Sequence, residues 1–173
     1  MPADCRTQQR AASLPFLTSG GDAVTMLHLA KVARQAIVTT NGTVVPHQDY
    51  MGYVNYLKNL DVFLSPFPFG NTNGIVDAFS VGLPGICKTG REVFERIDGA
   101  MFIRAYMPGW MVAETVEEYV EAALRLANNH EERESLRRYM LEKNVVQRFF
   151  EGRPEVFGEM VLDLVEQQRL KTA

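Results

Sequence analysis

Short hydrophobic runs alternate with amphipathic stretches along the first half of the chain, and this pattern predicts strands and helices in turn. The hydrophobic runs predict strands at residues 12–17, 43–45, 61–65 and 85–88. Between them, apolar side chains recur at three- and four-residue spacing and predict the intervening helices, one of them over residues 72–81. Such alternation is typical of βαβ units that build a parallel sheet.

The second half of the chain has the pattern of helices. Amphipathic stretches predict them at residues 91–97, 114–127, 131–143 and 155–171. Thr115-Val-Glu-Glu118 is a capping-box sequence directly ahead of an apolar stripe. We therefore predict an α/β fold, with a Rossmann-like parallel sheet and a helical C-terminal extension. The polar residues 1–11 are expected to be poorly structured, and residues 12–173 to form one domain.

Composition narrows the class of protein and its partners. Hydrophobic residues make up 46% and charged residues 23% of the chain, as in globular proteins. The formal net charge of −3 gives no reason to expect nucleic acid or an anionic membrane surface as a partner. No apolar run reaches the roughly 18 residues of a membrane-spanning helix, and the polar N-terminus lacks the apolar core of a signal peptide. Cys5 and Cys87 lack metal-ligand spacing, and with only two cysteines a reduced, cytoplasmic location is expected.

The most unusual segment follows the predicted strand at 61–65 and has the sequence Ser65-Pro-Phe-Pro-Phe-Gly-Asn-Thr-Asn-Gly-Ile-Val-Asp77. In open parallel sheets, ligands bind beyond the carboxyl ends of strands, where the helices that follow present free N–H groups. Asn71, Thr72 and Asn73 would place backbone N–H groups and side-chain donors at a helix N-terminus. The positive end of the helix dipole there suits a diphosphate.

Two more residues of this segment fit a nucleotide ligand. Gly74 keeps side-chain bulk away from the first helical turn. Asp77 lies one turn beyond Asn73, where its carboxylate can accept hydrogen bonds from vicinal ribose hydroxyls. A simpler interpretation is also open, in which Asn-Thr-Asn-Gly is a turn with a helix N-cap and Asp77 is an ordinary helix residue.

A second loop, Lys88-Thr-Gly-Arg91, is expected at the neighbouring strand end. Lys88 or Arg91 could lend positive charge to a departing diphosphate, although Lys88 could equally end its strand in solvent. We favour a pocket-lining role for Thr89 and Gly90. The chain contains no Asp-x-Asp sequence, so we do not expect a metal-held diphosphate or any cofactor.

Several ordered blocks of the chain resemble one family. Pro66-Phe-Pro-Phe-Gly-Asn-Thr-Asn-Gly-Ile-Val-Asp77 and Cys87-Lys-Thr-Gly-Arg-Glu-Val93 are similar to the C-terminal half of the bacterial cytoplasmic N-glycosyltransferases that glucosylate adhesins, which are related to the O-GlcNAc transferases. The resemblance covers about residues 44–163. It includes Thr115-Val-Glu-Glu-Tyr-Val120 and Asn128-Asn-His-Glu-Glu-Arg133.

The resemblance implies a GT-B architecture, in which two Rossmann-like domains face each other and the C-terminal one binds the UDP-sugar donor. It places Thr72 and Asn73 at the diphosphate and Asp77 at the ribose. It also implies that His47 and Gln48 contact the uracil edge and that Tyr53, or in reserve Tyr50, stacks on the base. Ordinary helix packing for the tyrosines and a surface position for His47 are open alternatives.

The chain departs from the family in what it lacks. The acceptor-binding domain, the helical N-terminal region and a diphosphate-contacting lysine have no counterpart in it, which suggests a fragment. The resemblance thus implies a donor-binding part that transfers glucose or N-acetylglucosamine to Asn or Ser/Thr of a protein held by a missing N-terminal domain. We expect it to be inactive alone and assign no catalytic residue. A non-catalytic nucleotide-sugar-binding or interaction domain is the alternative, and a GT-B epimerase or a transferase acting on small glycans is a third.

Overall fold

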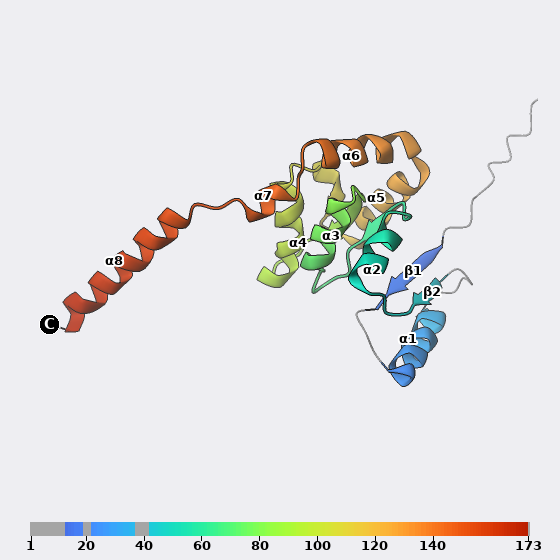
Figure 1. Ribbon diagram of the computed structural model, residues 1–173, viewed down its shortest axis with the longest axis horizontal. Coiled ribbons are helices and arrows are strands. Elements are labelled where there is room, and N and C mark those ends of the chain that lie inside the picture. The colour runs from blue at the N-terminus through green and yellow to red at the C-terminus, as the bar shows by residue number, and fades with distance from the viewer. Residues whose placement is uncertain (1–12, 19–21, 37–41, 173) are drawn as a thin grey trace, which may run out of the picture. The chain divides into compact units, whose positions relative to one another are not determined.

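The structure, a computed structural model, describes residues 13–18, 22–36 and 42–172 (Figure 1). The expectation for residues 1–11 lies outside these ranges. Contacts between residues divide the chain into two compact units, residues 1–53 and 54–173. The units are described separately below, and the predicted single domain over 12–173 stays a prediction.

The first unit contains a βαβ arrangement. Strand β1 (Leu14–Leu17) pairs in parallel with β2 (Gly42–Val45), with Leu14 opposite Gly42, and helix α1 (Ala23–Ala36) lies between them in sequence. The Asp22 carboxylate accepts a hydrogen bond from the Thr25 N–H at 2.8 Å, which caps α1. Helix α2 (Tyr50–Leu57) begins in this unit and ends in the second.

The second unit contains a three-stranded parallel sheet with the strand order β3-β4-β5. Its strands are β3 (Phe63–Leu64), β4 (Gly85–Lys88) and β5 (Val112–Ala113). Strands β3 and β4 were predicted as neighbours, whereas β5 was missed because two residues carry no periodic pattern. The strands are parallel as predicted, but among the described residues they form two separate small sheets and not one.

Helices and one short 3-10 turn make up the rest of the second unit. They are α3 (Thr72–Ser80), α4 (Val93–Arg104), η1 (Gly109–Met111), α5 (Val116–Asn128), α6 (His130–Glu142), α7 (Gln147–Phe150) and α8 (Pro154–Thr172). The predicted capping box is present, because the Thr115 hydroxyl accepts from the Glu118 N–H and the Glu118 carboxylate accepts from the Thr115 N–H. No helix of the described residues is long and apolar enough to cross a membrane.

Helix α4 continues well past the predicted end at Ile97. Gly99 lies in the part of the helix beyond Ile97 and is buried, and a Cβ added to it would lie 3.1 Å from a methyl carbon of Val112. The glycine therefore serves close packing of α4 against β5, and burial of Phe102 favours the extra turn. A helix-breaking residue is tolerated because tertiary packing outweighs the roughly 1 kcal/mol lost in helix propensity.

The core of the second unit lies between the sheet and helices α3 to α6. Its fully buried large side chains include Phe79, Phe102, Ile75, Leu83, Ile86, Met111, Leu126 and Met140. Phe79 and Phe102 meet edge to face with ring centroids 5.0 Å apart, which joins α3 to α4. Each such side chain stabilises the fold by about 1.5–3 kcal/mol, so the core fixes the strand ends from which the loops of interest start.

Candidate functional site

The loop that follows β3, residues 65–71, is called the β3–α3 loop below. It begins at Ser65, which is 1% exposed and donates its backbone N–H to the Ile86 carbonyl at 2.9 Å. The peptide bond between Phe67 and Pro68 is cis. Gly70 has a φ of 67°, a left-handed conformation that favours glycine. The chain therefore makes a tight turn between the end of β3 and the start of α3.

A buried carboxylate from α4 contacts both ends of this loop. Asp98 is 3% exposed, and its Oδ2 accepts hydrogen bonds from the Ser65 hydroxyl at 2.5 Å and from the Asn71 N–H at 3.0 Å. Asp98 was not predicted as a site residue, since the helix was predicted to end one residue before it. An acidic residue amid Ile97, Phe102 and Ile103 was the available signal.

Helix α3 begins with the N-cap that the simpler interpretation predicted. The Asn71 side-chain oxygen accepts from the Gly74 N–H at 3.0 Å. A Cβ on Gly74 would lie 2.3 Å from the Asn71 side-chain nitrogen, so only glycine fits beneath this cap. Thr72 and Asn73 are exposed, and no described hydrogen bond uses their N–H groups. The cap and an anion site are therefore compatible, because capping leaves these two donors available.

Asp77 lies one helical turn beyond Asn73 and is half-buried. The spacing of four residues puts both side chains on one face of α3, as predicted. The N–H donors of Thr72 and Asn73 and the carboxylate of Asp77 thus belong to one helix. Their roles toward a ligand stay predictions.

The loop after β4 lies beside the β3–α3 loop because β3 and β4 are paired. Lys88 is half-buried, with its Nζ 5.6 Å from the centroid of the Phe67 ring and 3.2 Å from the Thr89 carbonyl oxygen. The Thr89 N–H donates to the Ala113 carbonyl at 2.8 Å, which ties this loop to β5. The two strand ends that the sequence predicted as neighbours are therefore joined by a cation–π contact.

Tyr119 of α5 supports the β3–α3 loop from another direction. Its hydroxyl donates to the Ser65 carbonyl at 2.9 Å, and its ring meets Phe67 edge to face at 5.3 Å. Burial raises the pKa of Tyr119 to about 12, with a smaller effect from Cys87. Burial also raises the pKa of the Cys87 thiol to about 12, with the Asp98 charge adding to the shift. The thiol and the phenol therefore both stay neutral beneath the loop.

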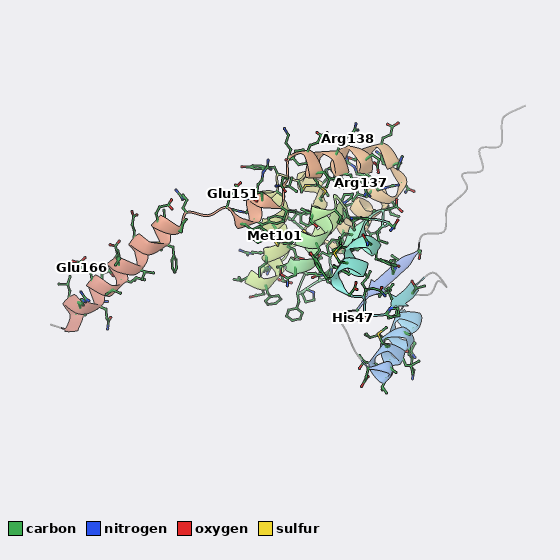
Figure 2. The ribbon with its side chains drawn as sticks, in the orientation of Figure 1. His47, Met101, Arg137, Arg138, Glu151 and Glu166 are labelled. Carbon is green, nitrogen blue, oxygen red and sulfur yellow. The ribbon has the colours of Figure 1, made fainter. Side chains whose placement is uncertain are left out.

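The residues predicted to contact the base belong to the first unit. His47 is exposed in the segment after β2 (Figure 2). Gln48 is exposed as well, and its side chain donates to the Pro46 carbonyl at 3.1 Å. Tyr53 is half-buried in α2. Contact of these residues with a base stays a prediction.

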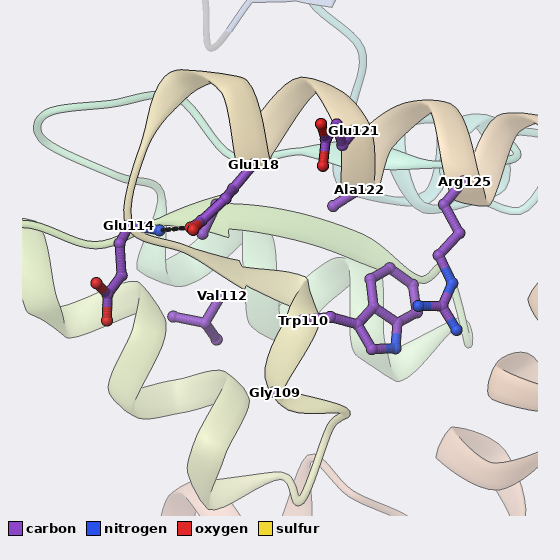
Figure 3. Close-up of a pocket in the computed structure, with 9 residues that line it drawn as sticks. Gly109, Trp110, Val112, Glu114, Glu118, Glu121, Ala122 and Arg125 are labelled. Carbon is purple, nitrogen blue, oxygen red and sulfur yellow. Dashed lines mark hydrogen bonds between the residues drawn. The ribbon is translucent and has the colours of Figure 1, made fainter.

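A separate pocket of about 550 Å³ is formed by η1, β5 and α5 (Figure 3). Its rim includes Trp110, whose ring is covered by the Arg125 guanidinium at 4.0 Å, and Glu118, which accepts from the Glu114 N–H at 2.8 Å. Arg125 also pairs with Glu132 at 2.6 Å. Glu118 and Arg125 of this pocket thus already have partners, and none of the predicted donor-binding residues lines it.

Among the described residues, no group of three or more His, Cys, Asp or Glu side chains could hold a metal ion. The contacts described above define the candidate site as the N-terminus of α3, Asp77 and the neighbouring Lys88–Thr89 segment.

Comparison with known proteins shows which proteins the chain resembles in structure and in sequence. In structure, the chain is similar to an O-GlcNAc transferase variant from Thermobaculum terrenum, with a TM-score of 0.70 and 18% identity over 90% of this chain and 30% of that one. The predicted α/β fold of the GT-B glycosyltransferases is thereby confirmed. No family model matches the chain.

In sequence, the chain is 50% identical over 123 residues to proteins of Actinobacillus pleuropneumoniae serotypes 5b and 7 that are named UDP-glucose:protein N-beta-glucosyltransferase. The match covers 71% of this chain but only 20% of those relatives, so the chain spans about a fifth of their length. The predicted resemblance to protein N-glycosyltransferases is thereby confirmed.

Proposed function

We propose that this chain is the UDP-hexose-binding part of a protein glycosyltransferase, which transfers glucose, or N-acetylglucosamine, to Asn or Ser/Thr side chains. The observation that carries the proposal is the start of α3, where the exposed Thr72 and Asn73 precede Asp77 by about one turn at the carboxyl end of β3. This is the position at which parallel α/β sheets bind nucleotides.

In this proposal the diphosphate lies at the N-terminus of α3. The N–H groups of Thr72 and Asn73 donate to phosphate oxygens, and the helix dipole favours the negative charge. Gly74, which has no side chain, leaves room for the Asn71 side chain that caps this first turn. Asp77 accepts hydrogen bonds from the two ribose hydroxyls.

The neighbouring loop completes the phosphate site. The Lys88 ammonium lies near Phe67 of the β3–α3 loop, where its charge favours the leaving diphosphate. Thr89 lines the same side of the site.

The reaction proposed for the whole enzyme is a displacement at the anomeric carbon of the sugar. The acceptor side chain forms a bond to this carbon and loses a proton, while the bond to the β-phosphate oxygen breaks and UDP leaves with the electron pair. The site assists by stabilising charge that develops on UDP and by holding the sugar in place. We expect this segment to bind the donor, and we expect other parts of such an enzyme to hold the acceptor protein. The whole enzyme is proposed to act in the cytoplasm.

Calorimetric titration with UDP tests the site. Each hydrogen bond to a charged group contributes about 1.5–3 kcal/mol, so Asp77→Asn should weaken UDP binding by roughly 10- to 100-fold. Asn73→Ala should weaken it less, because its backbone N–H remains. Asp163→Asn, which removes the same charge from an exposed position on α8, is the matched control and should bind as the parent does. No binding at millimolar UDP would contradict the proposal.

The alternative is a nucleotide-sugar-binding domain that takes no part in catalysis. Incubation with UDP-glucose and an Asn-x-Thr peptide should yield no glycopeptide from this chain by mass spectrometry, and product formation would show that the chain is active alone. Activity restored by adding the remaining parts of a related enzyme would exclude the alternative.

A further inference from the structure

We infer that Asp98 is a positioning residue, which holds the β3–α3 loop in the conformation that binds the donor diphosphate. The inference rests on the proposed function for its purpose, but its structural part can be tested apart from it. Asp98 comes from α4, and it contacts the first and last residues of the loop through one oxygen, Oδ2.

The cost of burying Asp98 shows that its role is not simple packing. The side chain is 3% exposed, and its Oδ1 has no hydrogen-bond partner among the described residues. A buried carboxylate with an unsatisfied oxygen destabilises a fold relative to an apolar side chain of similar size. The two hydrogen bonds that Asp98 accepts offset this cost, and both come from residues of the β3–α3 loop.

The contacts lead from Asp98 to the proposed phosphate donors in two steps. Asp98 accepts from the Asn71 N–H, and the Asn71 side chain in turn accepts from the Gly74 N–H. The N-cap residue Asn71 is thus held by the Asp98 carboxylate, and Asn71 in turn holds the first turn of α3. Thr72 and Asn73 lie between these two anchored residues, so their N–H directions depend on Asp98.

The packing of the loop leaves it little freedom. A Cβ on Gly70 would lie 2.4 Å from Asp98 Oδ2, so the backbone of the loop rests directly on the carboxylate. The Tyr119 hydroxyl donates to the Ser65 carbonyl, which is a further contact at the start of the loop. Removal of the carboxylate would leave a space beneath Gly70 and release the Asn71 end of the loop.

A substitution at position 98 can distinguish the effect of the hydrogen bonds of Asp98 from the effect of its charge. Because one oxygen accepts both bonds, the amide oxygen of an asparagine at this position can accept both as well. The negative charge lies behind the N-terminus of α3 and opposes a bound diphosphate. Asp98→Asn should therefore keep UDP affinity within about threefold of the parent or improve it, whereas Asp98→Ala should weaken UDP binding at least about tenfold.

The experiment measures UDP binding and hydrogen exchange on the full chain, well below the melting temperature of each variant. In Asp98→Ala without ligand, the amides of Asn71 and Gly74 should exchange at least about tenfold faster, while the amide of Thr89, which donates to Ala113, should not change. Asp163→Ala on α8 removes an exposed carboxylate and controls for charge. Asp98→Asn should restore slow exchange at both loop amides.

Each outcome decides a separate point. Unchanged exchange at Asn71 in Asp98→Ala would overturn the inference, as would faster exchange with unchanged UDP affinity. Equal loss of affinity in Asp98→Asn and Asp98→Ala would overturn it too, since the charge would then be what matters. If Asp98→Ala does not fold, Ser65→Ala, which removes one of the two bonds, should give faster exchange at Asn71 than in the parent, and parent-like exchange would overturn the inference. If the parent binds no UDP, the proposed function fails, and the exchange data still decide whether Asp98 holds the loop.

Discussion

Replacing Gly70 with alanine tests whether the β3–α3 loop has a single conformation. Gly70 has a φ of 67°, and a left-handed conformation costs an alanine about 1–2 kcal/mol. The added Cβ would also lie 2.4 Å from Asp98 Oδ2 and force the carboxylate to move. Loss of one of its two hydrogen bonds would cost about 1.5–3 kcal/mol more.

The expected destabilisation is therefore about 2–4 kcal/mol, after about 0.4–1 kcal/mol is subtracted for the lower entropy of the unfolded chain. This is a large part of the 5–15 kcal/mol by which domains are typically stable. Urea unfolding followed by the fluorescence of Trp110, the chain's one tryptophan, measures it. The same variant should bind UDP more weakly, because the start of α3 moves.

The matched control is Gly109→Ala. Nothing lies within 4 Å of a Cβ added to Gly109, and its φ is not in the left-handed region, so the change should leave the stability equal to that of the parent or raise it by up to about 1 kcal/mol. If Gly70→Ala is within about 0.5 kcal/mol of the parent, the loop can rearrange freely and the reasoning from its geometry is wrong.

Two further predictions concern the support beneath the loop. Tyr119→Phe removes the hydroxyl that donates to Ser65 but keeps the ring that meets Phe67, so urea unfolding should show a loss of about 1 kcal/mol, and an unchanged midpoint would contradict the role of this bond. Because burial raises the pKa of Cys87 from 9.0 to about 12, the unfolded chain loses the thiol proton at lower pH than the folded chain does. The free energy of unfolding should therefore fall as pH rises from about 9 to about 12, and less so in Cys87→Ala; identical pH profiles would contradict this.

Local sequence rules were sufficient to predict the start of α3. A strand-like run, turn formers and an Asn followed by glycine three residues later define the end of β3, the loop and the cap with no knowledge of distant contacts. The adjacency of β3 and β4 followed from the short helical crossover between them. These features depend on neighbours in sequence, which is why the pattern revealed them.

The features that were missed depend on distant contacts. Strand β5 exists because Val112 and Ala113 pair with β4, and Gly99 stays helical because α4 packs closely there. Asp98 was missed for the same reason, since only the packing of α4 beneath the β3–α3 loop buries it. Burial of a charged side chain is a tertiary property that composition and spacing do not encode.

The bonding of Ser65 has a consequence for how the sequence can vary during evolution. Its hydroxyl, carbonyl and N–H are each engaged by a different element, and the residue is 1% exposed. Alanine would lose a bond, and threonine would need space for a methyl group. Phe69, only four positions away, is 77% exposed and faces no such constraint. Related sequences should therefore tolerate exchange at position 69 far more readily than at position 65, and a random-substitution library scored for folded protein would reveal the same contrast.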